Sequence, residues 1–149
     1  MKLSTRGRYG LKAMVDLALE GDGSLVSVGT LAKTQGVSEA YLEQIIGSLK
    51  KAGLVSAERG AQGGYMLARS PESINAGQVL RALEGKTTLI DCVGNEKFDC
   101  QNACSCASRP LWLKLQARIN DVLDSTTIKD MADDYKKQMG RFKNDEGLS

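Results

Sequence analysis

SEAYLEQIIGSLKKAGLVSAERGAQGGYMLAR, residues 38–69, carries the most informative pattern in the chain. Apolar residues in its first half recur at spacings of three and four, which predicts an amphipathic helix over residues 39–52. Ser38 stands where an N-cap belongs, and Gly53 follows at the place of a left-handed C-terminal cap. The residues expected on the buried face of this helix are Leu42, Ile45, Ile46 and Leu49.

The second half of the same segment changes period. Residues 54–58 and residues 65–69 no longer follow the helical spacing and are interpreted as two short strands. The loop between them contains three glycines, which is typical of a flexible turn. A helix followed by a glycine-tipped β-hairpin is therefore predicted.

The residues that precede this segment predict two more helices. An amphipathic pattern over residues 9–20 indicates a first helix, which Ser4 or Thr5 can cap. A shorter helix is expected over residues 28–35, followed by a turn. Helix, short helix, turn, helix and hairpin, in this order, make a winged helix-turn-helix over residues 1–84. The alternative is an all-α domain that happens to carry a hairpin.

The C-terminal half predicts a capped helix from Asn75 and then residues 85–107, which have no clear period. A long helix starts at Ser108, and a shorter one follows it, together spanning residues 108–139. The polar residues 140–149 predict a disordered tail. The long helix is expected to pair with a second copy of the chain, although it could also fold back on its own domain. Its apolar stripe consists of Leu111, Leu115, Ile119 and Val122.

Composition narrows the class of protein. Of the 149 residues, 42% are hydrophobic and 26% are charged, as in an ordinary globular protein. Residues 1–70 carry nine Lys and Arg against six Asp and Glu, so this half is the better candidate for contact with phosphate. No signal peptide or membrane span is expected, which favours the cytoplasm. The chain has no histidine, which excludes Ser–His and Cys–His catalytic pairs, and no enzyme is predicted.

The exposed face of helix 39–52 offers hydrogen-bonding side chains near its N-terminal half. Glu43 could accept from a cytosine amino group, and Gln44 could make a two-point contact with adenine. A merely solvated polar face is the alternative. Arg59 at the hairpin tip suits an A·T-rich minor groove. The residues predicted to face double-stranded DNA are Arg6, Arg8, Ser38, Ala40, Tyr41, Glu43, Gln44 and Arg59.

Four cysteines lie within fifteen residues, in the order Cys92, Cys100, Cys104 and Cys106. In a reducing compartment such a cluster indicates thiolate–metal chemistry rather than disulfides. No two of these cysteines form a C-x2-C pair, which disfavours structural zinc without excluding it. The spacing alone leaves three hypotheses open: an iron–sulfur cluster, a zinc site, or free or redox-active thiols.

Four segments of this chain resemble the IscR-type regulators, which are iron–sulfur-sensing winged-helix repressors. They are MKLSTRGRYGLKAMVDLAL, VSEAYLEQIIGSLKKAGLV, RGAQGGYMLA and CASRPLW, and the resemblance covers about residues 1–135. The wider family includes nitric-oxide and cysteine-metabolism regulators. The resemblance implies a homodimeric regulator that represses genes of iron–sulfur cluster assembly.

The same resemblance implies a 2Fe–2S cluster held by Cys92, Cys100 and Cys106. Two departures concern this site: the first gap between cysteines is longer, and Arg109 stands where the family pattern has a histidine ligand. Arginine has no acceptor, so it is excluded as a ligand. Cys104 is then the local candidate for the fourth ligand, with an oxygen ligand or a partner-chain group as the alternative. The rival functions are a regulator with a zinc or thiol switch and a redox-active thiol protein that does not bind DNA.

Overall fold

The computed structural model describes residues 3–21, 23–88, 93 and 106–147. The mainly α-helical fold with one small hairpin, predicted from the sequence, is confirmed. Its elements in chain order are α1 (Thr5–Asp16), the π-helical turn η1 (Leu17–Gly21), α2 (Val28–Gln35), α3 (Glu39–Lys51), β1 (Val55–Glu58), β2 (Gly64–Leu67), the 3-10 turn η2 (Pro71–Ser73), α4 (Ala76–Glu84), α6 (Arg109–Ser125) and α7 (Ile128–Gly147).

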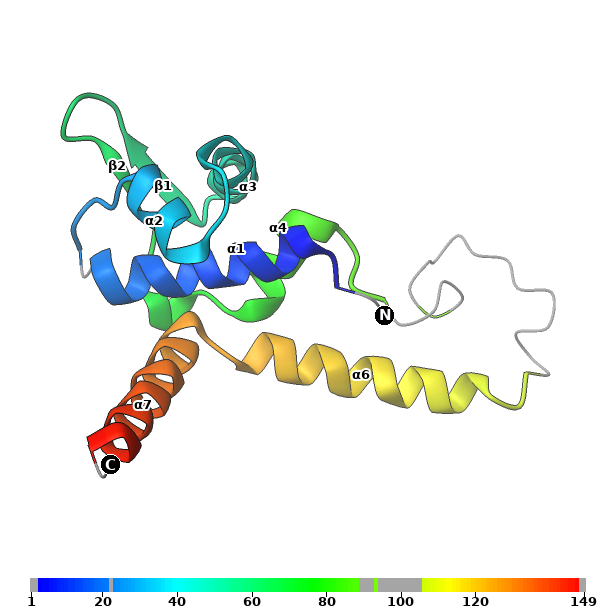
Figure 1. The fold of residues 1–149 in the computed structure, drawn as a ribbon. Helices are drawn as coiled ribbons and strands as arrows, with labels where there is room; N and C mark the ends of the chain where they lie inside the picture. The colour runs from blue at the N-terminus through cyan, green and yellow to red at the C-terminus, as the bar shows by residue number, and fades with distance from the viewer. Residues whose placement is uncertain (1–2, 22, 89–92, 94–105, 148–149) are drawn as a thin grey trace.

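Helix α1 runs through the middle of the molecule, with α2, α3 and the hairpin on one side of it and α6 and α7 on the other (Figure 1). The core between these elements is aliphatic and includes Met14, Leu31 and Ile74, none of which is exposed. The four residues predicted for the buried face of α3, Leu42, Ile45, Ile46 and Leu49, are all fully buried. Spacing by three and four therefore identified the core face of this helix correctly.

Short side chains cap the helices as the sequence predicted. Ser4 accepts a hydrogen bond from the backbone of Gly7 at the start of α1, and Ser38 accepts one from Tyr41 at the start of α3. Asn75 forms a complete capping box with Gln78 at the start of α4. Each cap satisfies a backbone N–H that the first helical turn leaves without a partner.

Two boundaries differ from the sequence expectation. The first helix starts at its cap rather than at residue 9, and its last turn, Leu17–Gly21, is π-helical. The prediction of a disordered tail over residues 140–149 is wrong for residues 140–147, because α7 continues through Gly140 to Gly147. Tyr135, Met139 and Phe142 continue the helical spacing past residue 139, although their side chains are exposed, and a single glycine inside a helix costs only about 1 kcal/mol.

The junction between α6 and α7 is fixed to the start of α4. Asn75 and Thr127 form an antiparallel bridge, and the backbone of Ile128 donates to the Ile74 carbonyl at 2.8 Å. One helical turn away, Arg81 of α4 pairs with Asp124 of α6 at 2.5 Å. These contacts attach one end of α6 to the body, while the rest of the helix extends past it (Figure 1).

No helix within the described ranges combines the length and the apolar character that a membrane crossing needs.

Candidate functional site

Helix α3 exposes a polar face opposite its buried one. Glu43 and Gln44 are exposed on it, and so are Ala40 and Gly47. The predicted cap Ser38 is exposed beside the first turn and already accepts the Tyr41 N–H at 3.2 Å. Because the opposite face is held by four fully buried side chains, the polar face has a fixed position at the surface.

Tyr41 lies between this face and the core. It is half-buried, and its ring meets that of Tyr9 edge-on, with centroids 6.1 Å apart. The Nζ of Lys12 lies 5.1 Å from the centre of the Tyr9 ring. Much of the Tyr41 side chain therefore packs α3 against α1, which the sequence pattern did not indicate.

The two arginines at the start of α1 have different surroundings. Both side chains are exposed, but Arg6 donates to the Ser48 hydroxyl of α3. The Arg8 side chain forms no hydrogen bond or ion pair with the described residues, and it lies in the same first turn, where a cation opposes the helix dipole. Arg6 thus links α1 to α3, whereas the Arg8 side chain is exposed to solvent.

A groove separates α3 from the hairpin. Gly47 and Lys50 line it from α3, and Arg59 lines it from the hairpin loop. The hairpin is held in place by Val26, whose backbone exchanges two hydrogen bonds of 2.8 Å with Tyr65. Lys50 is not among the residues predicted from the sequence to face DNA, although its spacing of seven from Glu43 places both on one helical face. Two basic side chains, Lys50 and Arg59, and one acidic side chain, Glu58, line this groove.

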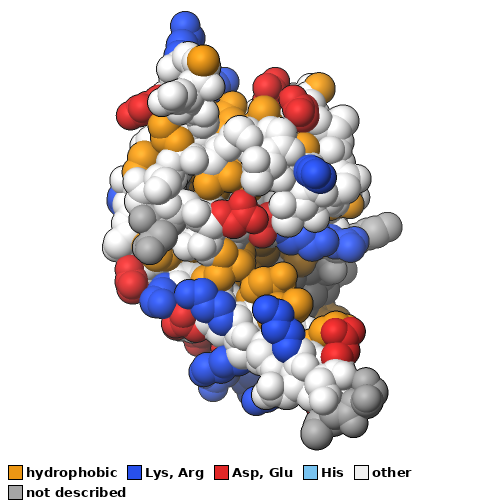
Figure 2. All heavy atoms as spheres, turned by 60° about the vertical axis from the view of Figure 1, so that its left-hand side comes forward, with side chains coloured by type: hydrophobic (Ala, Val, Ile, Leu, Met, Phe, Trp, Pro, Cys, Tyr) orange, Lys and Arg blue, Asp and Glu red, His pale blue; other side chains and the backbone are white. Residues whose placement is uncertain are grey.

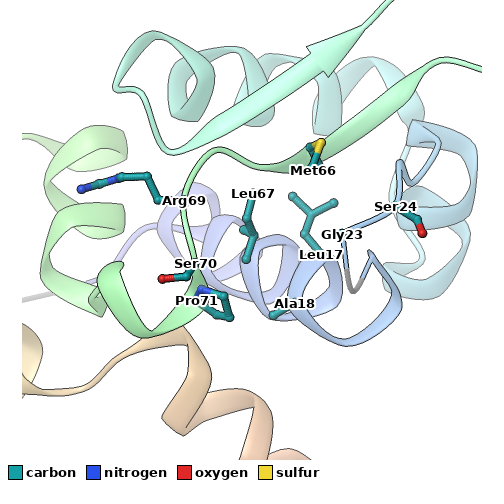
Figure 3. Close-up of a pocket in the computed structure, with 9 residues that line it drawn as sticks. All are labelled: Leu17, Ala18, Gly23, Ser24, Met66, Leu67, Arg69, Ser70 and Pro71. Atoms are coloured by element: carbon teal, nitrogen blue, oxygen red, sulfur yellow. The ribbon is translucent and has the colours of Figure 1, made fainter.

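Another hollow, drawn in Figure 3, lies between η1, the loop after it and β2. Leu17, Ala18 and Leu67 face it, while the Arg69 side chain extends away from these three residues. Its apolar wall offers no converging polar groups, so it does not form a chemical site.

Of the four cysteines, Cys106 is in the described part of the chain, and Cys92, Cys100 and Cys104 lie outside it. Cys106 precedes α6, and its Sγ lies 3.4 Å from the Ser108 hydroxyl. This side-chain hydrogen bond, and then backbone hydrogen bonds from Ser108 and Arg109, lower the pKa of the partly exposed Cys106 thiol. A helix N-terminus that stabilises a thiolate favours metal binding or redox reactivity.

The same end of α6 contains a buried polar atom. The Nε of Arg109 has no hydrogen-bond partner within the described residues. An anionic group beside the helix N-terminus would supply the missing acceptor, and a thiolate-held cluster is such a group. The surroundings of Cys106 and Arg109 therefore fit a metal–thiolate centre, while the residues described do not themselves bring together three or more ligands for a metal.

The family model for "Rrf2: Iron-dependent Transcriptional regulator" matches residues 3–134. This chain belongs to the Rrf2 family. The match includes all elements from α1 to α6 and the start of α7.

Relatives and solved structures agree with the family assignment. The chain is 41% identical over 132 residues to the HTH-type transcriptional regulator CymR of Bacillus subtilis, covering 89% of this chain and 90% of CymR. It is 37% identical over 149 residues to IscR of Vibrio parahaemolyticus, covering 100% and 88%. The solved structure of T. potens IscR has a TM-score of 0.74 at 43% identity, covering 93% of this chain and 90% of that one.

A second solved structure, CymR "the Global Cysteine Regulator of B. subtilis", has a TM-score of 0.76 at 40% identity and covers 89% and 97%. Together these relatives make this Rrf2 protein a DNA-binding transcription regulator rather than an enzyme, as predicted. They also confirm the winged helix-turn-helix fold.

Proposed function

We propose that the Rrf2 protein reads its operator with α3 in the major groove and the hairpin in the adjacent minor groove. The observation that supports this proposal is the exposed polar face of α3, backed by buried aliphatics and bordered by a groove with Lys50 and Arg59. Short residues such as Ala40 let the helix approach the base edges closely, and Ser38 and Tyr41 lie at the same end. Glu43 and Gln44 then contact bases, and Arg59 enters the minor groove.

Glu43→Ala and Gln44→Ala should each reduce discrimination at one base position by about 1–3 kcal/mol. Neither change touches the buried face of α3, so folding should be unaffected. Fluorescence anisotropy with a selected operator and its single-base variants measures the effect. Equal affinity of the unaltered protein for operator and scrambled duplexes would contradict sequence-specific reading.

Arg8→Ala should weaken binding to all sequences alike and reduce the slope of log affinity against log salt by about one. Arg6→Ala should also weaken binding, but its loss of the Ser48 contact should disturb α3 and change base preference as well. Titrations at three or more salt concentrations separate the two outcomes. If both variants changed only base preference, neither arginine would contact phosphate.

The proposed assembly is a homodimer formed through α6. On the side of α6 towards the body, the Gln116 amide donates to the Thr87 carbonyl at 2.8 Å, and Asp124 pairs with Arg81. Three residues of the predicted stripe remain exposed, Leu111 by 52%, Leu115 by 40% and Val122 by 63%, whereas Ile119 is half-buried. A 17-residue helix with a solvated apolar stripe favours pairing with a second copy. Two recognition helices could then reach half-sites roughly 34–36 Å apart.

Val122→Asp should convert this dimer into a monomer, because it places a charge in the paired stripe but not in the monomer core. Lys114→Asp, on a charged face of the same helix, is the matched control and should leave the dimer intact. Light scattering at micromolar concentration gives both masses. A monomeric mass for the unaltered chain would rule out the dimer.

The proposed cofactor is a 2Fe–2S cluster held by Cys92, Cys100 and Cys106, with Cys104 as the candidate fourth ligand. Residues 85–107 connect the DNA-binding part to α6, so ligation there would restrict how the two recognition helices are spaced. The coupling to DNA affinity is expected to be about 1–3 kcal/mol. Similarity to IscR supports cluster-assembly genes as targets. Comparing protein with and without the cluster on one operator, at fixed salt, tests the coupling.

A second candidate function replaces the cluster with zinc or a thiol switch. The similarity to a protein described as a global cysteine regulator supports this alternative. Anaerobic absorption spectroscopy with metal analysis distinguishes the cluster, the zinc site and the thiol switch. Visible charge-transfer bands indicate a cluster, bound metal without colour indicates zinc, and neither signal indicates thiols alone.

A further inference from the structure

A pocket of about 420 Å³ lies where α7 packs against α1 and α2. Figure 2 shows hydrophobic side chains gathered in the crease between the body and α7, the projection that ends in grey. This volume is within the range of small-molecule sites, which are apolar with a few placed polar groups. The apolar part of the wall consists of Leu11, Val15, Leu19, Met131 and the ring of Tyr135.

Two polar side chains of the wall, Asp16 and Gln35, hydrogen-bond to each other and leave one buried acceptor unfilled. Asp16 accepts from the Gln35 amide nitrogen at 3.0 Å, but the Gln35 Oε1 is buried and without a hydrogen-bond partner in the described ranges. A buried acceptor without a donor is unfavourable, and a ligand group that donates to it removes that cost. Burial is the largest cause that raises the pKa of Asp16, so this carboxylate is poorly solvated and would gain from a cation.

Lys12, which also lines the pocket, attracts the Asp16 carboxylate electrostatically, but it forms no ion pair with it among the described residues. Its Nζ lies over the Tyr9 ring, 5.1 Å from the centroid, and it is exposed at the rim. A ligand that complements the wall therefore brings an ammonium group to Asp16 and Gln35 and an apolar body to the aliphatic side chains. A carboxylate on the same ligand would meet Lys12.

We propose that this pocket binds a small amino acid with an aliphatic side chain. The site lies outside the α3 face, the hairpin and the cysteine segment, so it is separate from the DNA and cluster sites proposed above. It joins α7 to the last turn of α2, the helix that precedes the recognition helix. Occupancy would therefore fix α7 against the DNA-binding unit.

Isothermal titration with L-leucine tests the proposal on DNA-free protein. Two analogues, each lacking one charged group, provide the ligand controls: 4-methylpentanoate has no ammonium, and 3-methylbutylamine has no carboxylate. We expect saturable leucine binding, at least about tenfold weaker binding of 4-methylpentanoate, and a smaller loss for the amine.

Asp16→Asn and Gln35→Met should each weaken leucine binding by about tenfold or more. Both preserve side-chain size, and circular dichroism checks that they fold. Glu72→Gln removes an exposed carboxylate outside the pocket and should bind as the unaltered protein does. No saturable binding, or equal binding of leucine and 4-methylpentanoate, would overturn the proposal, as would leucine binding unaffected by both pocket variants. Operator binding is measured separately, so failure here leaves the DNA-binding proposal standing.

Discussion

Gly64→Ala is expected to lower the free energy of unfolding by about 2–3 kcal/mol and to weaken operator binding severely. A Cβ at Gly64 would lie 2.6 Å from the backbone oxygen of Val26. The Val26 backbone cannot move aside as a flexible side chain can. The two hydrogen bonds between Val26 and Tyr65 must therefore break or lengthen. Each contributes about 1 kcal/mol, and their loss releases the hairpin from the body.

Gly47→Ala is the matched control, because it makes the same chemical change at an exposed helical position. A Cβ there meets no atom within 4 Å, and alanine is favoured over glycine inside a helix by about 0.5–1 kcal/mol. The free protein should therefore be more stable. Operator affinity should nevertheless fall, since Gly47 lines the groove beside Lys50 where we propose that DNA approaches. Urea unfolding and anisotropy titrations measure the two quantities. Equal stability changes at Gly64 and Gly47 would contradict the close-approach argument.

Cys106→Ala should abolish the visible absorption of protein purified without oxygen. Its thiol lies at the N-terminus of α6, where hydrogen bonds favour the thiolate, and alanine removes the ligand without disturbing a buried core. Cys92→Ala and Cys100→Ala should have the same effect on the spectrum. Iron and sulfide analysis of each variant shows whether loss of colour is loss of the cluster.

Cys104→Ala provides the comparison within the same segment. If Cys104 is the fourth ligand and a substitute group can replace it, the variant should keep a cluster with an altered spectrum. Absorption unchanged by Cys106→Ala would contradict the proposed ligand set. An unchanged spectrum for Cys104→Ala would instead indicate that a group other than Cys104 is the fourth ligand.

Local patterns predicted the N-terminal half of the chain in detail. The buried face of α3, the caps at Ser4, Ser38 and Asn75 and the positive φ of 77° at Gly53 all follow from interactions within a few residues. Apolar spacing identifies a helix face, and a capping side chain satisfies a backbone group in the same turn. Such signals do not depend on where the rest of the chain goes.

The features that the sequence did not predict depend on packing between segments that lie far apart in the chain. Sequence spacing showed that α6 has an apolar stripe, but only the contacts of Gln116 and Asp124 with the body show which side of the helix is covered within one chain. The link from Arg6 to Ser48, the packing of Tyr41 on Tyr9 and the Asp16–Gln35 pocket likewise join residues far apart in the chain. Amphipathicity specifies which side of a helix must be covered, and the three-dimensional arrangement of the helices specifies what covers it.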